Sequence, residues 1–295
     1  MRPMQELGTI KAIYRYPVKS MAGETLTETT LGPQGIPGDR AWAVRDEVRG
    51  GIRGAKKIAA LMQCAARYEV EPAQGAAPPA RITLPNGETM WSNDENAAAQ
   101  LSAALDHAVT LWPLLPADAL DHYRRGEPDN EDFEAELRSI FGRNPDEPLP
   151  DLSKFPSEIF EYESPLGTYF DAFPLMIMTQ TSLDHMQATS PASNFDVRRF
   201  RPNFLIEAKD PGGSLPEFGW GNSRLQIGDT TIRTTIDCPR CVMTTHGFAD
   251  LPRDPGIMRA IVKEAGGSLG LYAAIDTPGG VRVGDTVRLT ERLPD

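Results

Sequence analysis

Short strand-like runs recur along this chain between stretches rich in glycine and proline; some alternate apolar with polar side chains and others are apolar throughout. The first covers residues 9–16 and stops at Pro17, as a half-buried strand does. Further runs are expected to form strands at 41–44, 67–70, 81–84, 109–111, 174–178, 204–207, 225–227 and 230–236. With 26 glycines and 26 prolines separating them, short strands of this kind indicate an antiparallel sheet or barrel.

Turn and capping signals add two hairpins and three helices to this pattern. Asn86-Gly87 predicts one hairpin, and Gly284-Asp285 predicts a final hairpin within 281–289. Helices are expected at 92–106, where Ser92 and Glu95 have the spacing of a capping box; at 181–187, capped by Thr181 or Ser182; and from Asp254-Pro255 to Gly266-Gly267. The expected fold class is therefore α+β, mostly β, with a few short helices.

An acidic stretch at 127–151 interrupts the strand pattern. Phe133, Leu137, Ile140 and Phe141 fall at helical spacing within it, between proline-rich flanks. This spacing predicts a short amphipathic helix in an insertion, with a mobile loop as the alternative.

Charge and cysteine content narrow the functional classes. The net charge of −11 argues against a nucleic-acid-binding protein, because phosphate contacts need a basic face. No apolar stretch reaches the length of a signal peptide or membrane span, so we expect a cytoplasmic protein without a membrane partner. The three cysteines cannot all pair, and a reducing compartment would keep them as thiols.

The segment Cys238-Pro239-Arg240-Cys241 has four interpretations. A zinc site would need two more soft ligands, and a redox dithiol would precede a helix, whereas 242–245 is β-branched and strand-like. Two buried small residues are the plainest alternative. The fourth interpretation is a single thiolate bound to a soft metal that an organic cofactor carries, with Arg240 favouring the thiolate.

Two other segments could hold an anionic cofactor. In Phe200-Arg201-Pro202-Asn203 the guanidinium and the carboxamide would share one face of an extended chain and could grip a phosphate and a heterocycle. Tyr16-Pro17-Val18-Lys19-Ser20 could form an anion cradle. An ordinary ion pair for Arg201, a solvated loop for Lys19 and a surface pair of Asp39 with Arg40 remain the alternatives.

Taken in order, these segments resemble the MOSC family, whose fold is shared by the C-terminal domains of molybdenum-cofactor sulfurases and the mitochondrial amidoxime-reducing component. The resemblance spans about 9–289 and rests on 16–20, 38–40, 201–203, 238–241 and 283–285. It implies a MOSC β-barrel domain at 157–292, a β-rich MOSC N-terminal domain at 5–125 whose first strands can pack into the second domain, and the acidic insertion or loop between them at 126–156.

The resemblance also implies the ligands of a molybdenum cofactor (Mo-molybdopterin). Cys241 would ligate the metal and be the catalytic residue, whereas Cys238 has no ligand role. The residues that would contact the pterin or its phosphate are Lys19, Ser20, Arg40, Arg201, Asn203, Pro239, Arg240 and Cys241.

The implied activity is a two-electron reduction of N-hydroxylated, related N-oxygenated or S-oxide small molecules. Related bacterial proteins often carry a C-terminal iron–sulfur domain, but nothing after Arg282 offers its cysteines, so a separate ferredoxin, flavodoxin or cytochrome b5-like protein with a reductase would supply the electrons. The segment 172–174 also lacks a hydroxyl of the animal pattern. The alternatives are a carrier that holds sulfur as a Cys241 persulfide or binds the cofactor transiently, and a binding module without catalysis.

Overall fold

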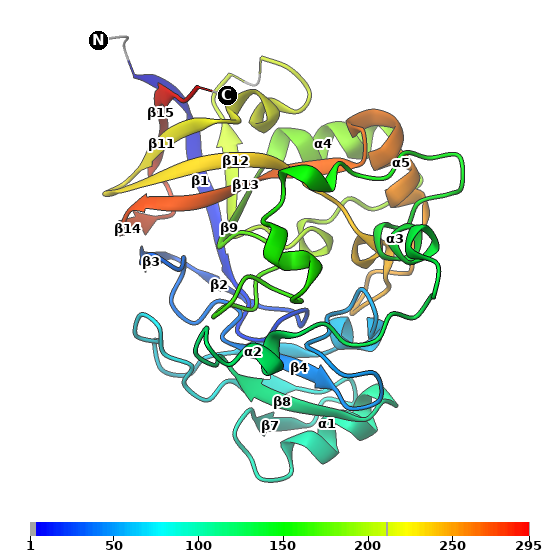
Figure 1. Ribbon diagram of the computed structural model, residues 1–295. Helices are drawn as coiled ribbons and strands as arrows, with labels where there is room; N and C mark the ends of the chain where they lie inside the picture. The colour runs from blue at the N-terminus through cyan, green and yellow to red at the C-terminus, as the bar shows by residue number, and fades with distance from the viewer. Residues whose placement is uncertain (1–3, 211, 295) are drawn as a thin grey trace.

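Seven strands close into a barrel in the computed structural model, which describes residues 4–210 and 212–294 (Figure 1). Around the barrel, each strand is hydrogen-bonded to the next in the order β10-β9-β13-β12-β11-β15-β1, and β1 also pairs with β10. The barrel strands are β1 (Gln5–Arg15), β9 (Leu175–Thr179), β10 (Phe204–Ala208), β11 (Ser223–Ile227), β12 (Thr230–Pro239), β13 (Ser268–Thr277) and β15 (Thr286–Arg292). Only β9 and β10 run parallel; the other barrel pairs are antiparallel, and β2 (Glu24–Leu26) adds to the edge of β1.

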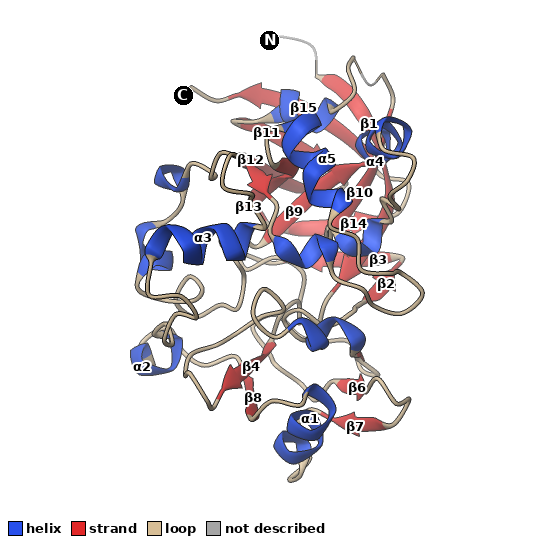
Figure 2. Ribbon diagram, turned by 90° about the vertical axis from the view of Figure 1, so that its right-hand side faces the viewer, coloured by secondary structure: helices blue, strands red, loops and turns tan. Residues whose placement is uncertain are grey.

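The barrel interior is filled by aliphatic side chains at alternate strand positions, and this is the basis on which a period-two pattern predicts a strand such as β1. Ile10, Ile206, Leu225 and Val287 are all buried in this one cluster. The strand β13, which lies between β9 and β12, was not predicted from the sequence. On the outside, α4 (Gln180–Thr189) and α5 (Gly256–Ala265) cover one face (Figure 2), where Leu183 and other apolar side chains of both helices contact the strands.

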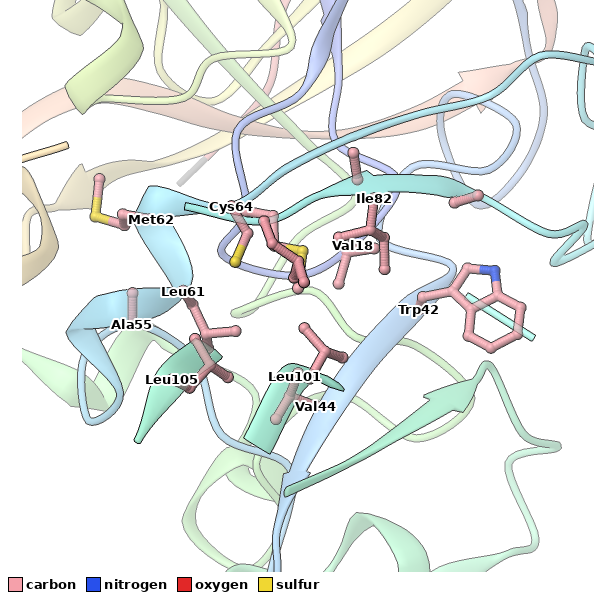
Figure 3. Packing of buried hydrophobic residues seen from close by; sticks show 14 of the residues in the cluster. Val18, Trp42, Val44, Ala55, Leu61, Met62, Cys64, Ile82, Leu101 and Leu105 are labelled. Atoms are coloured by element: carbon pink, nitrogen blue, oxygen red, sulfur yellow. The ribbon is translucent and has the colours of Figure 1, made fainter. Parts of the chain in front are cut away.

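Two small sheets lie beyond one end of the barrel (Figure 1). One pairs β4 (Trp42–Asp46) with β8 (Val109–Pro113), and the other orders β5 (Ala65–Arg67), β6 (Arg81–Thr83) and β7 (Thr89–Trp91). With α1 (Ala97–Leu105) they enclose the second apolar core, which includes Trp42, Leu61 and Leu101 (Figure 3). Met243 and Phe248 belong to this core as well, so the segment after Cys241 packs against the N-terminal part of the chain.

The acidic insertion contains α3 (Phe133–Phe141), which confirms the predicted helix, and the short helix α2 (Leu120–Tyr123) precedes the insertion. Asp132 caps it by accepting from the N–H of Ala135, and Gly142 ends it in the left-handed conformation. Lys57 forms ion pairs with Glu136 of α3 and with Asp129, which tie the insertion to the N-terminal part.

The mostly β fold class and the Asn86-Gly87 hairpin, which joins β6 and β7, are confirmed. The final hairpin is wrong. The turn forms, but β14 (Gly279–Arg282) pairs with β3 (Glu28–Leu31), whereas β15 pairs with β1 and β11. Val281 of β14 and Val287 of β15 are nevertheless buried in the same core.

Two capping predictions are also wrong. The hydroxyl of Ser92 accepts from the N–H of Ala80 instead of capping a helix, and α1 begins only at Ala97. The cap of α4 is Thr179, whose side chain accepts from the N–H of Ser182. Within the described residues no helix combines the length and apolarity needed to cross a membrane.

Candidate functional site

All eight predicted site residues line a single cavity of about 70 Å³, which we call the cysteine cavity. Its walls also include Asp171, Phe173, Met176, Arg199, Phe200, Cys238, Met243 and Tyr272. A larger cavity of about 470 Å³, the tyrosine cavity, is lined by Tyr14 and Tyr16 among others and shares Ser20 and Arg201 with the first. The two cavities therefore meet at these two residues.

Cys241 lies where the long strand β12 has ended. The N–H of Arg240 donates to the carbonyl oxygen of Gly267, which holds the strand end in place, and Cys241 then precedes the 3-10 helix Val242–Thr245. The strand expected at 242–245 is wrong, because its four residues turn back into the N-terminal core. The Cys241 side chain is half-buried, whereas Cys238 is buried and its Sγ accepts from Arg240 Nη1 at 3.0 Å.

Burial raises the pKa of the Cys241 thiol, and this effect exceeds the opposing influence of Lys56 and Arg240. Arg240 does lower the pKa of Cys241, as expected, but the net effect of the surroundings is to raise it. A metal ion at this position would therefore be needed to keep the sulfur deprotonated near neutral pH.

Arg201 has a left-handed backbone with φ of 58°, so the extended-chain argument that placed it beside Asn203 is wrong. Its guanidinium stacks on the ring of Tyr16, 4.1 Å from the centroid, and its Nη1 donates to Met21 O at 2.5 Å. Burial lowers the pKa of this guanidinium to about 10. The turn, rather than an extended chain, brings Arg201 to the cavity.

Ser20 and Arg40 share this left-handed conformation, with φ of 71° and 50°. In the part of the chain that the structure describes, six non-glycine residues have a positive φ, and these two and Arg201 make up half of them. Such strain is concentrated at functional sites in proteins, because the surroundings must stabilise it.

Several predicted ligands already have partners within the chain. Asn203 Oδ1 accepts from the N–H of Met176 at 3.1 Å, and its Nδ2 donates to Tyr14 O and Asp39 Oδ2. Asp39 is fully buried and paired with Arg40, so the surface pair considered for these two residues is wrong. The carboxamide of Asn203 therefore joins three segments of the fold.

Lys19 and Ser20 are also engaged. Lys19 Nζ donates to Tyr169 O at 2.7 Å and to Asp171 at 3.0 Å, and Ser20 Oγ accepts from the N–H of Ala55 at 2.9 Å. The loop expected for Lys19 is thus buried rather than solvated.

Three buried guanidinium nitrogens have no hydrogen-bond partner within the described chain, and two of them, Arg201 Nη2 and Arg240 Nε, belong to arginines of the site; the third is Arg259 Nε. Arg201 and Arg240 line the cysteine cavity. Because an unpaired buried donor is costly, such atoms indicate a site for an anionic ligand. The residues present therefore fit an anionic cofactor that also takes a thiolate from Cys241.

Asp171, Lys56 and Tyr272 were not predicted from the sequence. Asp171 pairs with Lys19 and with Lys56, and these cations hold the pKa of its carboxyl well below the usual range although burial acts in the opposite direction. The position of Asp171 beside the segment 172–174 is the one signal that could have directed attention to it. For the zinc alternative, no group of three or more His, Cys, Asp or Glu side chains among the described residues is placed to hold a metal ion.

Comparisons with known proteins match both parts of the chain. Residues 166–288 match the MOSC domain, and residues 7–105 match the MOSC N-terminal beta barrel domain. The mitochondrial amidoxime reducing component 2 of Homo sapiens is 24% identical over 97% of this chain and 84% of its own length, and the mitochondrial amidoxime-reducing component 1 of Mus musculus is 24% identical over 98% and 84%. The solved YUAD protein from Bacillus subtilis superimposes loosely, with a TM-score of 0.43 and 10% identity over 97% of this chain and 98% of that one. On these domain matches, the chain belongs to the MOSC family, with the family's N-terminal barrel domain preceding the MOSC domain.

Proposed function

We propose that this protein binds a molybdenum cofactor and reduces N-hydroxylated or related N-oxygenated small molecules, or S-oxides. The observation that carries the proposal is the convergence of a half-buried thiol, Cys241, with unpartnered N–H donors of Arg201 and Arg240 on one cavity. The names of the relatives support the reductase activity.

Residues from both the N-terminal and the C-terminal part of the chain would hold the cofactor. Cys241 would supply a thiolate to the metal, and Arg240, whose Nη1 also contacts Cys238, would add positive charge beside it. Arg201, shared by the two cavities, would donate Nη2 to an anionic group of the pterin, with Lys19, Ser20 and Arg40 on the same wall. When bound, the cofactor would supply two-electron redox chemistry, and the protein would hold it and leave one face open to substrate.

The electrons would come from a separate electron-transfer protein, of the ferredoxin, flavodoxin or cytochrome b5 type with its reductase. The substrate would approach Cys241 from solvent, because its side chain is half-buried whereas that of Cys238 is buried.

Metal analysis of the full chain, purified from a host that makes the cofactor, tests the proposal. We expect about one molybdenum atom per chain, the ratio that a single thiolate ligand implies, and reduction of an N-hydroxylated compound with a chemical electron donor. Cys241→Ala should lose both, whereas Cys64→Ala, in the N-terminal core, should retain both. Metal-free, inactive protein would contradict the proposal, and an adduct of about 32 Da on Cys241 without molybdenum would favour the sulfur carrier instead.

A further inference from the structure

The aromatic ring of Tyr16 is shared by two arginines of the candidate site. The guanidinium carbon of Arg201 lies over this ring at 4.1 Å from its centroid, and that of Arg40 lies over it at 5.0 Å. A guanidinium over the face of an aromatic ring is attracted by the quadrupole of the ring, most strongly where water is excluded. Tyr16 is only 5% exposed, so its ring is shielded from water.

Hydrogen bonds attach the same tyrosine to the backbone at or beside each arginine. Its hydroxyl donates to Pro202 O at 3.0 Å, and its carbonyl oxygen accepts from the N–H of Arg40 at 2.7 Å. Arg201 and Arg40 both have the left-handed backbone conformation, which non-glycine residues rarely adopt unless their surroundings stabilise it. Tyr16 therefore bonds to both strained turns and contacts both guanidinium groups with its ring.

The position of Tyr16 does not depend on the arginine side chains. Its N–H donates to Asp39 Oδ1 at 2.7 Å, directly after β1 has ended. The ring occupies space that a side chain at residue 23 would need, since a Cβ at Gly23 would lie 2.6 Å from Tyr16 Cδ1. The ring is therefore a fixed surface against which the longer arginine side chains pack.

These contacts leave the charge of Arg201 uncompensated. Its Nη1 donates to Met21 O, its Nη2 has no partner within the described chain, and no carboxylate of the described residues forms an ion pair with it. A carboxylate at the place of the ring would neutralise the guanidinium, whereas a neutral ring holds it and leaves its charge to attract an anion. Without the ring, Arg40 would repel Arg201 from the wall that the two cavities share.

We propose that Tyr16 is a positioning residue for the anionic group of the cofactor: the electron-rich face of its ring keeps the guanidinium groups of Arg40 and Arg201 together at the wall of the cysteine cavity, where they bind that group jointly. This inference deepens the proposed function and rests on it for the identity of the anion, a phosphate-type group. Tyr16 acts through the two arginines and is not itself a ligand.

The rate at which molybdenum leaves the loaded protein tests the inference. The purified protein is transferred to buffer without cofactor, and the molybdenum that stays bound is measured over time. We expect Tyr16→Leu, which removes the ring, to lose molybdenum about tenfold faster than the wild-type protein, the size that loss of a desolvated cation–π contact implies. Tyr16→Phe keeps the ring and loses only the bond to Pro202 O, so its rate should stay within about twofold of the wild-type rate.

A ring of similar shape but weaker quadrupole separates the electrostatic contact from packing. A phenylalanine that carries three ring fluorines, incorporated in place of Tyr16, nearly keeps the volume of the ring but withdraws electron density from its face. This variant should lose molybdenum nearly as fast as Tyr16→Leu. It also decides the question if Tyr16→Leu does not fold.

Tyr68→Leu is the matched control. Arg15 lies over the ring of Tyr68 at 5.1 Å from the centroid, and the Tyr68 hydroxyl donates to Gly38 O at 3.0 Å, so this substitution removes the same two types of contact. Tyr68 and Arg15 line neither the cysteine cavity nor the tyrosine cavity. Tyr68→Leu should therefore lose molybdenum at the wild-type rate, even where its free energy of unfolding falls.

A wild-type rate of molybdenum loss in either Tyr16→Leu or the fluorinated variant would overturn the inference and leave the proposed function standing. Loss from Tyr16→Phe or Tyr68→Leu that is as fast as from Tyr16→Leu would overturn it too, because the hydroxyl or a general loss of stability would then be the cause. A wild-type protein purified without molybdenum would overturn both, and this is seen before any variant is made.

Discussion

The Arg143 side chain and the Arg240 backbone donate to the same acceptor, the carbonyl oxygen of Gly267. Arg143 Nη2 lies 3.0 Å from it and the Arg240 N–H 2.9 Å. Arg143 follows α3, and Arg240 precedes Cys241, so the acidic insertion contacts the strand end that presents the candidate metal ligand.

Loss of the hydrogen bond from Arg143 to the carbonyl oxygen of Gly267 should destabilise the protein. Arg143 is buried and also donates to Phe141 O, so we expect Arg143→Ala to lower the free energy of unfolding in urea by about 2 to 3 kcal/mol, the range for losing hydrogen bonds of a charged group. Arg124→Ala, which breaks an exposed pair with Glu161, should cost less than about 1 kcal/mol. Equal losses of unfolding free energy in the two variants would contradict a stabilising role for the buried hydrogen bonds of Arg143.

The two cysteines of the CxxC segment should respond in opposite ways to substitution. Cys238→Ala removes the acceptor of Arg240 Nη1 from a buried site, so the free energy of unfolding should fall by about 1 to 2 kcal/mol while molybdenum is retained. Cys241→Ala should lose molybdenum with little change in stability of the cofactor-free protein, because its side chain is half-buried. Metal analysis and urea unfolding of both variants test this prediction. Loss of molybdenum from Cys238→Ala but not from Cys241→Ala would show that Cys238 is the metal ligand.

Local patterns were sufficient to predict most elements of this fold. The period-two run at 9–16 predicts β1, the apolar runs at 174–178 and 204–207 predict β9 and β10, whose apolar residues are buried on both faces, and helical spacing predicts α3. Strand pairing was not predictable in the same way. Residues 279–292 have the sequence of a hairpin. In the fold, however, β14 pairs with β3, and β15 lies between β1 and β11, so the two strands pair with distant segments and not with each other.

The candidate site shows the same division. Cys241 and the arginines could be named from short segments because their residue types match the chemistry of an anionic, metal-carrying ligand. The left-handed turn at Arg201 has no signature in its residue types, since glycine and asparagine usually occupy that conformation. Asp171 and Lys56 come from distant parts of the chain and meet only after folding, so neither attracts attention alone.

Asn203 was predicted to bind the cofactor, but its carboxamide forms hydrogen bonds within the protein. Its carboxamide joins β1, β9 and the Asp39 turn, and the residue is 1% exposed. We expect Asn203→Ala to lower the free energy of unfolding of the cofactor-free protein by about 2 to 4 kcal/mol, because a buried N–H and a buried carboxylate lose a partner. Asn194→Ala, whose side chain is exposed, is the control. An unchanged unfolding free energy for Asn203→Ala would indicate that the carboxamide serves only a ligand.

Glu217 provides a pH test that is independent of the cavity. Its side chain is fully buried, Oε2 accepts from the hydroxyls of Thr179 and Ser182 at 2.7 and 2.5 Å, and Oε1 has no partner within the described chain. Burial raises the pKa of this carboxyl above its ordinary value of about 4.5, and the two hydroxyl donors offset the shift only in part.

The sign of the effect on stability follows from this shift. Above the ordinary pKa, the unfolded chain releases the Glu217 proton while the folded protein still holds it, so rising pH favours unfolding until the folded pKa is passed. Glu217→Gln stays neutral at every pH and should therefore gain stability relative to the wild-type protein as the pH rises from about 4 toward neutrality. Urea unfolding at several pH values measures this difference, and Glu207→Gln, an exposed change on β10, controls for the loss of one charge. A difference between Glu217→Gln and wild type that is constant with pH would show that the buried carboxyl ionises normally in the folded protein.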